Sequence, residues 1–494
     1  MGLSEILSKQ AELTLADWAE AGSGWTHWPY LVRYHASQLP ADWRELMAGR
    51  YAAVLESGRS GHLTILLPQS EEVRVYQPGG RVVVHHAGGA YEMEKQNPLD
   101  FLASISQTMR APTFKGWPIF QGGWLMLLGY ELAKYYEPIV PAPADVLMPE
   151  AVFLAAREVL IFDAQQQSLT VVILKEIAAP TKAVWESSRQ RAEQLARDWF
   201  KACPGVAPTW PAVTEPLAPP ALSLSADHFC KAVQRCQFYI AAGDSYQVNL
   251  STRFEVPPIQ PEAAYAWLRA HNPSPYMGLV RYPGGSLVCG SPELLVQVVD
   301  GKISSRPIAG TRPRGQDVAA DEAWARELAG DTKERAEHLM LVDLLRNDIG
   351  RVALPGSVRV AEFMTVERYS HVMHLVSQVE GHLASGQTPA DVVRALFPGG
   401  TITGAPKVRT MQIIAELEPV ARGFYTGSLG WLGANGSLTL NIIIRSLWTN
   451  GERTLVQAGA GIVADSVGAR EFKEASRKAQ APLLAAQMAP KKSC

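Results

Sequence analysis

The sequence is poor in cysteine. Five cysteines occur in 494 residues, at positions 203, 230, 236, 289 and 494, and no two of them form a Cys-x-x-Cys pair. An odd number of cysteines, none of them in a Cys-x-x-Cys pair, indicates neither a disulfide framework nor a zinc site. Because unpaired thiols are typical of a reducing compartment, we expect the protein to work in the cytoplasm.

Long apolar runs and an excess of one charge are also missing. No apolar run reaches the ~20 residues of a membrane-spanning helix, the closest being 122–130. The N-terminus lacks the basic and apolar regions of a signal peptide, and Ile6 stands where a myristoylation motif needs Ser or Thr. The formal net charge is −2, with both signs mixed along the chain. We therefore expect neither a membrane nor a nucleic acid as partner.

What the sequence does have is length and apolar content. With 47% hydrophobic and 19% charged residues it can bury a sizeable core, and it is too long for one ordinary domain. Six prolines within 204–220 indicate an extended linker. We expect two large lobes, an N-terminal region over 1–203 and a second region over 227–494, joined by a Pro-rich linker over 204–226.

Strand-like runs and long helical patterns are interspersed along the chain. Alternating and β-branched runs predict strands, and longer amphipathic patterns predict helices. The predicted strands are 63–67, 73–76, 81–85, 159–163, 169–174, 287–290, 294–299, 302–306, 370–379, 427–432, 439–447 and 454–459, and the predicted helices are 183–202, 227–242, 320–345 and a last one near the C-terminal end. This mixture favours an α+β fold over a regular βαβ winding.

The run FPGGTITGAPK at 397–407 opens directly into a helical pattern. Glycines allow close backbone approach, and a helix start with free N–H groups near a lysine suits an anion. Gly399 and Gly404 have P-loop spacing, but Lys407 comes two residues late and no hydroxyl follows it, which disfavours a nucleotide site. A Gly-rich turn that only caps the helix is the plainer alternative.

Two helical segments carry glutamates three residues apart. Glu334 and Glu337 form one pair, and Glu471 and Glu474 form the other. This spacing places each pair on one helix face. If the two faces meet, they form an oxygen-lined site for a hard divalent cation, completed by water and substrate oxygens. Glutamates beside Lys and Arg on a helix are more commonly a solvated face, so either pair alone is weak evidence.

Other side chains stand out by their position. Arg445 follows the apolar strand 438–444, where a permanent cation either meets an acid or reaches solvent. His371 and His374 could bind a metal or be buried and hydrogen-bonded. Glu293 follows a strand and a proline turn, a position that can aim one acid into a cleft.

Seven motifs occur in a characteristic order: GDSYQVN (243–249), NPSPYM (272–277), GSPE (290–293), RPIAGT (306–311), HLMLVD (338–343), FPGGTITGAPK (397–407) and GAG (459–461). On these motifs the sequence resembles the chorismate-utilising enzymes, a family that includes the large subunits of anthranilate synthase and aminodeoxychorismate synthase, isochorismate synthase and salicylate synthase. The resemblance is close over 227–494 and fainter upstream. It implies the two-lobed α+β fold of the anthranilate synthase large subunit, with antiparallel β-sheets packed as a sandwich and helices outside.

The resemblance also implies roles for the candidate residues. Glu337 and Glu474 resemble the ligands of a Mg²⁺ ion on the ring carboxylate of chorismate, with Glu334 and Glu471 as supporting acids. Glu293 resembles the general acid that protonates the departing C4 hydroxyl. The other implied contacts are Thr401 and His374 beside the ring, Arg445, Tyr425, Gly461 and Lys478 as carboxylate clamps, and Lys407 and Gly459 as further substrate-binding residues.

Gln247 helps to decide whether water or ammonia attacks the chorismate ring. Isochorismate and salicylate synthases have a water-activating lysine at this place, and an amide cannot act as that base. The resemblance therefore favours ammonia over water. The chain has no cysteine in a Gly-x-Cys-x-Gly elbow, so we expect ammonia to come from a separate glutamine amidotransferase subunit or from solution.

Two amination products remain open. The FPGG and VCGSPELL motifs resemble aminodeoxychorismate synthases, whereas Ala309 and NPSPYM are common in anthranilate synthases. The FPGG and VCGSPELL motifs carry more weight. The resemblance therefore favours amination to 4-amino-4-deoxychorismate, for para-aminobenzoate and folate biosynthesis. Ala309 excludes covalent catalysis by a lysine at that position. The alternatives are anthranilate formation for tryptophan biosynthesis and a non-catalytic regulatory paralogue.

Overall fold

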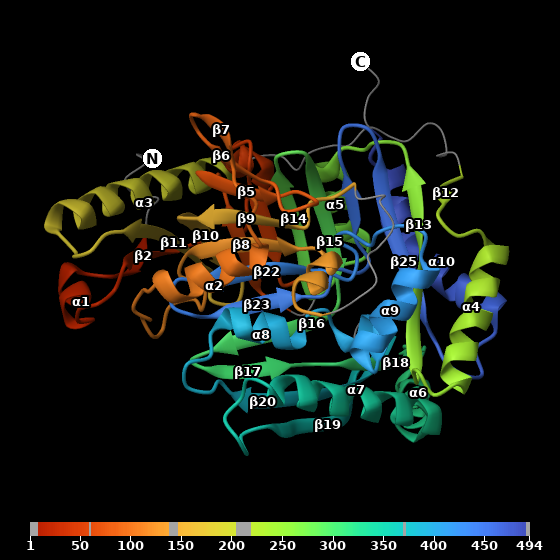
Figure 1. Ribbon diagram of the computed structural model, residues 1–494. Coiled ribbons are helices and arrows are strands. Elements are labelled where there is room, and N and C mark those ends of the chain that lie inside the picture. Colours follow the sequence, from red (N-terminus) through yellow and green to blue (C-terminus); the bar gives the residue numbers. More distant parts are fainter. Residues whose placement is uncertain (1–7, 59–60, 138–146, 204–218, 369–371, 491–494) are drawn as a thin grey trace.

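The computed structural model describes residues 8–58, 61–137, 147–203, 219–368 and 372–490 (Figure 1). Two large antiparallel sheets form the centre of this part of the chain. The first runs in the order β1 (Lys9–Glu12), β2 (His27–His35), β11 (Ser168–Glu176), β10 (Glu158–Asp163), β4 (Leu63–Leu67), β3 (Ala53–Glu56), β14 (Tyr276–Tyr282), β15 (Gly285–Ser291), β24 (Leu447–Thr449), β25 (Thr454–Ile462), β13 (Gln247–Val256) and β12 (Ala221–Leu222), with β21 (Gly404–Ala405) also paired to β13.

The second sheet runs in the order β18 (Ile308–Pro313), β20 (Val372–His382), β17 (Lys302–Ser305), β16 (Leu294–Val299), β23 (Leu438–Asn441), β22 (Ser428–Gly433), β8 (Gly123–Leu128), β9 (Ala151–Ala156), β5 (Glu72–Tyr76), β6 (Val82–His86) and β7 (Gly89–Met93), with β19 (Arg359–Arg368) paired to β20. The α-helices are α1 (Leu15–Glu20), α2 (Pro98–Thr108), α3 (Lys182–Ala202), α4 (Ala226–Ala241), α5 (Pro261–His271), α6 (Val318–Gly330), α7 (Thr332–Gly350), α8 (Pro389–Leu396), α9 (Lys407–Leu417) and α10 (Gly468–Gln487). Short 3-10 helices are η2 (Trp43–Met47), η3 (Tyr130–Tyr135) and η4 (Gly400–Ile402).

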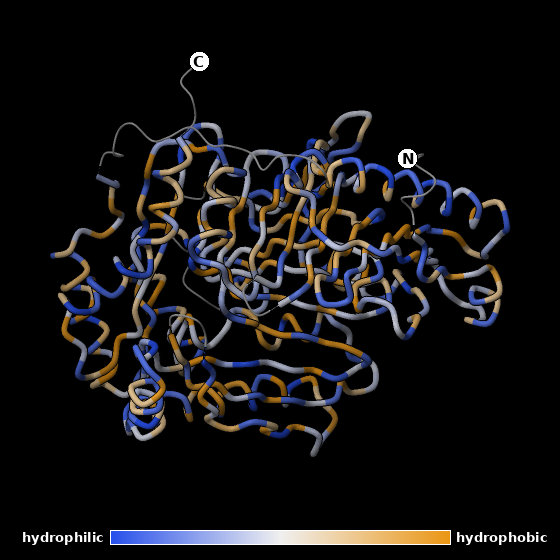
Figure 2. Tube along the Cα trace, turned by 180° about the vertical axis from the view of Figure 1, so that it is seen from behind, coloured by the Kyte–Doolittle hydropathy of each residue, from blue (hydrophilic) through white to orange (hydrophobic). Residues whose placement is uncertain are grey.

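The sheets and helices pack in layers. One apolar cluster lies between the two sheets and contains residues of both, such as Leu31 and Leu127. A second cluster joins the outer face of the first sheet to α3, α5 and α10, and a third joins the outer face of the second sheet to α2, α7 and α8. Figure 2 shows hydrophobic residues concentrated on the strands in the interior. The predicted α+β sandwich with helices outside is thereby confirmed.

The Pro-rich segment does not separate two hydrophobic cores. Strand β3 pairs with β14, and β8 pairs with β22, so both sheets join strands from the two sides of the segment. All three large clusters likewise mix the two halves of the chain. Of the predicted linker 204–226, residues 204–218 lie outside the described part. In its remainder, 221–222 form an edge strand and α4 begins at Ala226.

Most predicted elements are found within two residues of their expected ends, but two are interrupted. The predicted helix 320–345 is two helices, α6 and α7, divided at Asp331. The predicted strand 439–447 is divided between β23 and β24. Arg445 lies in this break, with a φ of 53° that a regular strand does not allow.

Helix α7 begins with a strong cap. Asp331 Oδ1 accepts hydrogen bonds from the backbone N–H groups of Lys333 and Glu334 at 3.0 and 3.1 Å, and its Oδ2 accepts one from Arg312 Nη2 at 2.8 Å. A carboxylate at the N-terminus of a helix satisfies free N–H groups and matches the helix dipole. Asp331 therefore fixes the start of the helix that carries Glu334 and Glu337.

No helix in the described ranges has both the length and the apolar character needed to cross a membrane. The apolar run 122–130, which came closest in the sequence, contains the buried strand β8.

We predict that Asp331→Ala lowers the free energy of unfolding by about 1 kcal/mol through loss of the cap alone, and by more through loss of the Arg312 contact. Asp331→Asn keeps an oxygen in the capping position and should lose less. Urea denaturation of the two variants measures the difference. Equal losses would show that the cap bonds do not contribute to stability.

Candidate active site

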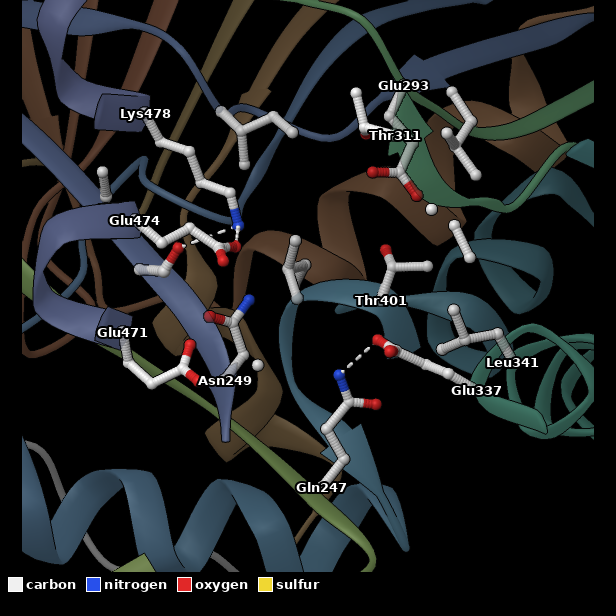
Figure 3. A pocket seen from close by; sticks show the side chains of 18 of the residues that line it. Gln247, Asn249, Glu293, Thr311, Glu337, Leu341, Thr401, Glu471, Glu474 and Lys478 are labelled. Carbon is white, nitrogen blue, oxygen red and sulfur yellow. Dashed lines mark hydrogen bonds and ion pairs between the residues drawn. The ribbon is translucent and has the colours of Figure 1, made fainter. Parts of the chain in front are cut away.

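A cavity of about 760 Å³ lies between α7 and α10 and is floored by residues of β13, β18, β25 and η4. Most of the predicted site residues line it: Gln247, Glu293, Glu334, Glu337, Thr401, Tyr425, Arg445, Gly459, Gly461, Glu471, Glu474 and Lys478. His374 and Lys407 do not line it. Residues separated by more than 200 positions in the sequence thus meet around one volume (Figure 3).

The four glutamates reach this cavity from the two helices. Each of them has a polar partner among the described residues, which for Glu471 is Ser466. Glu337 Oε1 accepts a hydrogen bond from Gln247 Nε2 at 2.8 Å, and Glu474 lies 2.7 Å from Lys478 Nζ (Figure 3). Glu334 Oε1 lies 3.4 Å from Arg312 Nη1. The i, i+3 spacing therefore places each pair on an inward helix face, as predicted.

The cavity disfavours negative charge on two of these acids. Burial raises the pKa of Glu337, and the hydrogen bond from Gln247 opposes the rise. Burial also raises the pKa of Glu471, opposed by Ser466 and reinforced by the negative charge of Glu474. A cation placed between the helices would favour the ionised form of both carboxyls.

The residues fit a Mg²⁺ site that substrate completes. Among the described residues, no group of three or more His, Cys, Asp or Glu side chains is close enough to hold a metal ion by itself. The available donors are carboxylate oxygens, which Mg²⁺ prefers. Mg²⁺ is commonly held by one or two carboxylates together with substrate oxygens and water. One glutamate from each helix therefore suffices for this donor chemistry.

Unpartnered polar atoms also face the cavity. Within the described part of the chain, Gln247 Oε1, Asn249 Oδ1 and Gln457 Oε1 are buried and have no hydrogen-bond partner. Buried polar atoms are normally hydrogen-bonded. Three unsatisfied acceptors on one wall indicate that a polar ligand with hydrogen-bond donors belongs there.

Arg445 supplies positive charge to the same cavity. No ion pair links its guanidinium to an acid in the described ranges, and burial lowers its pKa, while Tyr425 and Glu474 oppose this shift. Its backbone lies in the left-handed region, at φ 53°. A strained, half-buried arginine without an ion pair suits a carboxylate ligand.

Glu293 is the most deeply buried acid of the cavity, with 6% of the residue exposed. Burial raises its pKa from 4.5 to about 7, although Thr401 and Lys478 act in the opposite direction. A carboxyl group that titrates near neutral pH can hold a proton and donate it within the site.

Two glycines make room for Gln247. A Cβ atom on Gly461 would lie 2.3 Å from Gln247 Nε2, and one on Gly404 would lie 1.9 Å from the Gln247 carbonyl oxygen. Gly404 also has a φ of 133°. The Gly-rich run therefore allows β21 to pair closely with β13. This close pairing explains the glycine without a bound phosphate.

Lys407 and His374 lie behind the cavity wall rather than on it. Lys407 Nζ is 2.7 Å from Asp348 Oδ2 and also donates to the Leu396 carbonyl. The anion beside the start of α9 in this structure is thus a carboxylate of the protein itself, and the role of Lys407 in substrate binding stays a prediction. His374 Nδ1 lies 3.0 Å from the hydroxyl of Thr311, which does line the cavity. His371 lies outside the described residues.

Sequence reasoning missed several lining residues, among them Asn249, Thr311, Lys333, Gln457 and Arg477. Two of them carry a detectable signal. Asn249 and Gln457 lie two positions from Gln247 and Gly459 on their strands, and residues two apart on a strand share one face. Lys333 and Arg477 resemble ordinary solvated helix residues in the sequence.

Comparison with known proteins names the family. The model of the chorismate binding enzyme family matches residues 54–484. The chain belongs to the chorismate binding enzyme family. The motif-based expectation is confirmed, and the cavity is the candidate chorismate site of a family member.

Individual relatives of this chorismate-binding enzyme are similar over most of their length. Aminodeoxychorismate synthase component 1 of Bacillus subtilis (strain 168) is 42% identical over 434 residues, covering 87% of this chain and 90% of the relative. Anthranilate synthase component 1 of Streptomyces coelicolor is 42% identical over 456 residues, covering 89% and 86%. The crystal structure of anthranilate synthase component I from Streptococcus pneumoniae TIGR4 superposes with a TM-score of 0.71 and 32% identity, covering 87% of this chain and 93% of that chain.

We predict that Glu293→Gln stabilises this chorismate-binding enzyme in a pH-dependent way. The pKa of Glu293 is about 7 in the folded protein against an ordinary 4.5, so the folded state binds the extra proton between these values. Wild-type stability therefore falls relative to the variant as pH rises from 4.5 to 7, by on the order of 3 kcal/mol, and the difference stays constant above pH 7. Urea denaturation of both proteins at pH 4.5, 6 and 8 measures this difference. A difference that does not change with pH would contradict the raised pKa.

Proposed function

We propose that the protein is an aminodeoxychorismate synthase component I, which aminates chorismate with ammonia to 4-amino-4-deoxychorismate and water. The observation that carries this proposal is a buried acid with a pKa of about 7, Glu293, in one cavity with the unpartnered cation Arg445 and two carboxylate-bearing helices. The 42% identity to the Bacillus subtilis relative of that name supports the choice of product.

Chorismate is a dicarboxylate, and the cavity offers two kinds of anion receptor. Glu337 and Glu474 would hold Mg²⁺, with Glu334 and Glu471 in support. When bound, Mg²⁺ screens the charge of a substrate carboxylate. Arg445 and Lys478, together with the Tyr425 side chain and the Gly461 backbone, would bind carboxylate oxygens directly. Thr401 would lie beside the ring.

Glu293 would act as the proton donor. Hydroxide is a poor leaving group, so the C4 hydroxyl must gain a proton as its C–O bond breaks. The protonated Glu293 carboxyl gives up that proton, and the hydroxyl leaves as water. The resulting carboxylate regains a proton from the amine nitrogen, which loses one as the neutral amine forms.

Gln247 favours ammonia as the nucleophile. Its Nε2 donates a hydrogen bond to Glu337, and its Oε1 is buried without a partner among the described residues, so the amide offers a free acceptor. An acceptor can orient the N–H bonds of ammonia, but an amide cannot remove a proton from water. This chemistry supports amination over hydration.

The ammonia would come from a separate glutamine amidotransferase subunit. The two curated relatives are named as component 1. Cys289 stands in the nearest context to a nucleophile elbow, and it is fully buried in β15, where burial raises its pKa. A buried thiol in its neutral form is a poor nucleophile.

Anthranilate formation is the second candidate function. Ala309 lines the cavity, so no lysine at that position can attack the ring, and the Streptomyces coelicolor relative of that name is as similar, at 42% identity. A non-catalytic regulatory role is disfavoured, because an inactive pocket would have no need to keep Arg445 and Glu293 buried.

An assay of the purified chain with chorismate, Mg²⁺ and ammonium chloride at alkaline pH separates these functions. We expect chorismate loss, with para-aminobenzoate formed only after an aminodeoxychorismate lyase is added. Anthranilate fluorescence without the lyase would establish the second candidate instead.

Glu293→Gln is the control for the same assay, because it keeps the shape of the side chain and removes the proton. It should bind chorismate but not consume it. Absence of chorismate loss in the wild type would leave only the non-catalytic alternative.

A further inference from the structure

A single arginine outside the cavity connects several of its walls. Arg422 is 1% exposed and is one of the largest fully buried side chains of the described chain. It follows α9 and lies behind the cavity wall rather than on it. Glu418 accepts from its Nε at 2.8 Å and from its Nη2 at 2.6 Å, a bidentate pair.

The other guanidinium hydrogens of Arg422 reach segments that line the cavity. Nη2 also donates to the carbonyl oxygen of Asn249 at 2.6 Å, and Nη1 donates to the carbonyl oxygen of Ile402 at 3.0 Å and to Thr426 Oγ1 at 3.3 Å. These contacts and the Glu418 pair use all five N–H donors of the guanidinium. A lysine has three donors without the planar fork, so it cannot reproduce this set.

Two aromatic rings enclose the same guanidinium. Its central carbon lies 4.8 Å from the ring centre of Tyr130 and 5.5 Å from that of Tyr425. Tyr425 lines the cavity. Tyr130 begins η3, so this arginine also attaches a segment of the N-terminal half to the site.

Glu418 extends the network to one further wall. Its Oε1 accepts hydrogen bonds from the backbone N–H of Ser251 at 2.9 Å and from the Ser251 hydroxyl at 2.8 Å. That hydroxyl accepts one from Gln457 Nε2 at 2.8 Å. The hydrogen bond to Ser251 fixes the Gln457 amide. Its Oε1, which has no partner among the described residues, is left free to accept a hydrogen bond.

We propose that Arg422, paired with Glu418, is a positioning residue that sets the placement of Asn249, the Thr401–Ile402 turn, Tyr425 and Gln457 around chorismate. It touches neither substrate nor metal. The charge pair joins β13, η4, the 422–426 turn and β25 through hydrogen bonds whose geometry a different cation cannot copy. This proposal depends on the proposed function only in taking chorismate as substrate.

Arg422→Lys tests the proposal, with Arg281→Lys as the matched control. Arg281 makes similar contacts, to Glu262 and to the carbonyls of Met47 and Gly49, but none of these residues lines the cavity. The measurement is kcat and KM for chorismate loss, normalised to the folded fraction from circular dichroism, together with the melting temperature. We expect kcat/KM to fall roughly 10- to 100-fold in Arg422→Lys and to stay at the wild-type value in Arg281→Lys, even if both melt earlier.

Ser251→Ala is the second variant. It removes only the hydroxyl that connects Glu418 to Gln457. It also tests the proposal if Arg422→Lys does not fold. It should raise KM for chorismate with a smaller effect on kcat. If both cavity-side variants lose stability while their kinetic constants per folded molecule match the wild type, Arg422 is only structural and the proposal is wrong. Wild-type protein without chorismate turnover would instead refute the proposed function. The proposal would then be tested by calorimetric chorismate binding to the same variants.

Discussion

The burial of acidic side chains around one cavity is the constraint on which this structure depends. Helices α7 and α10 bring four glutamates to one cavity, and within each pair the neighbouring carboxylate adds to the effect of burial, Glu334 on Glu337 and Glu474 on Glu471. The protein supplies part of the compensation, through Gln247, Lys478 and Arg312. Lys333 and Lys478 also lower the pKa values of Glu337 and Glu471, but burial still raises both above their ordinary value. The proposed Mg²⁺ would add the positive charge that these carboxylates still lack.

The fold serves this arrangement by fixing both helices on the sandwich. Helix α7 packs on the second sheet and α10 on the first, so the distance between the glutamate pairs is set by the packing of the whole molecule. Since both sheets combine strands from the two halves of the chain, the N-terminal half supports the site without supplying its acids. Arg422 adds a local connection between the walls.

Much of the site could be predicted from the sequence, for physical reasons that differ by residue. The glutamate pairs were found because i, i+3 spacing is local, and Glu293 because a proline turn follows its strand. The ion pair of Lys407 with Asp348 could not be predicted, because the two residues are 59 positions apart and no local pattern connects them. Arg422 pairs locally with Glu418, but its bonds to Asn249 and Ile402 come from segments farther away in the sequence, so its role across the cavity walls could not be predicted. Spacing therefore predicts which face a side chain takes, but not which partner it finds there.

The central claim is that Glu337 and Glu474 share one cation with chorismate, and calorimetric titration of chorismate with and without Mg²⁺ tests it most directly. In the wild type, Mg²⁺ should strengthen chorismate binding by about tenfold or more, and chorismate should strengthen Mg²⁺ binding equally. In Glu337→Gln and in Glu474→Gln this mutual strengthening should disappear. If either variant keeps the full effect of Mg²⁺ on chorismate affinity, the two helices do not share the ion and the account is wrong.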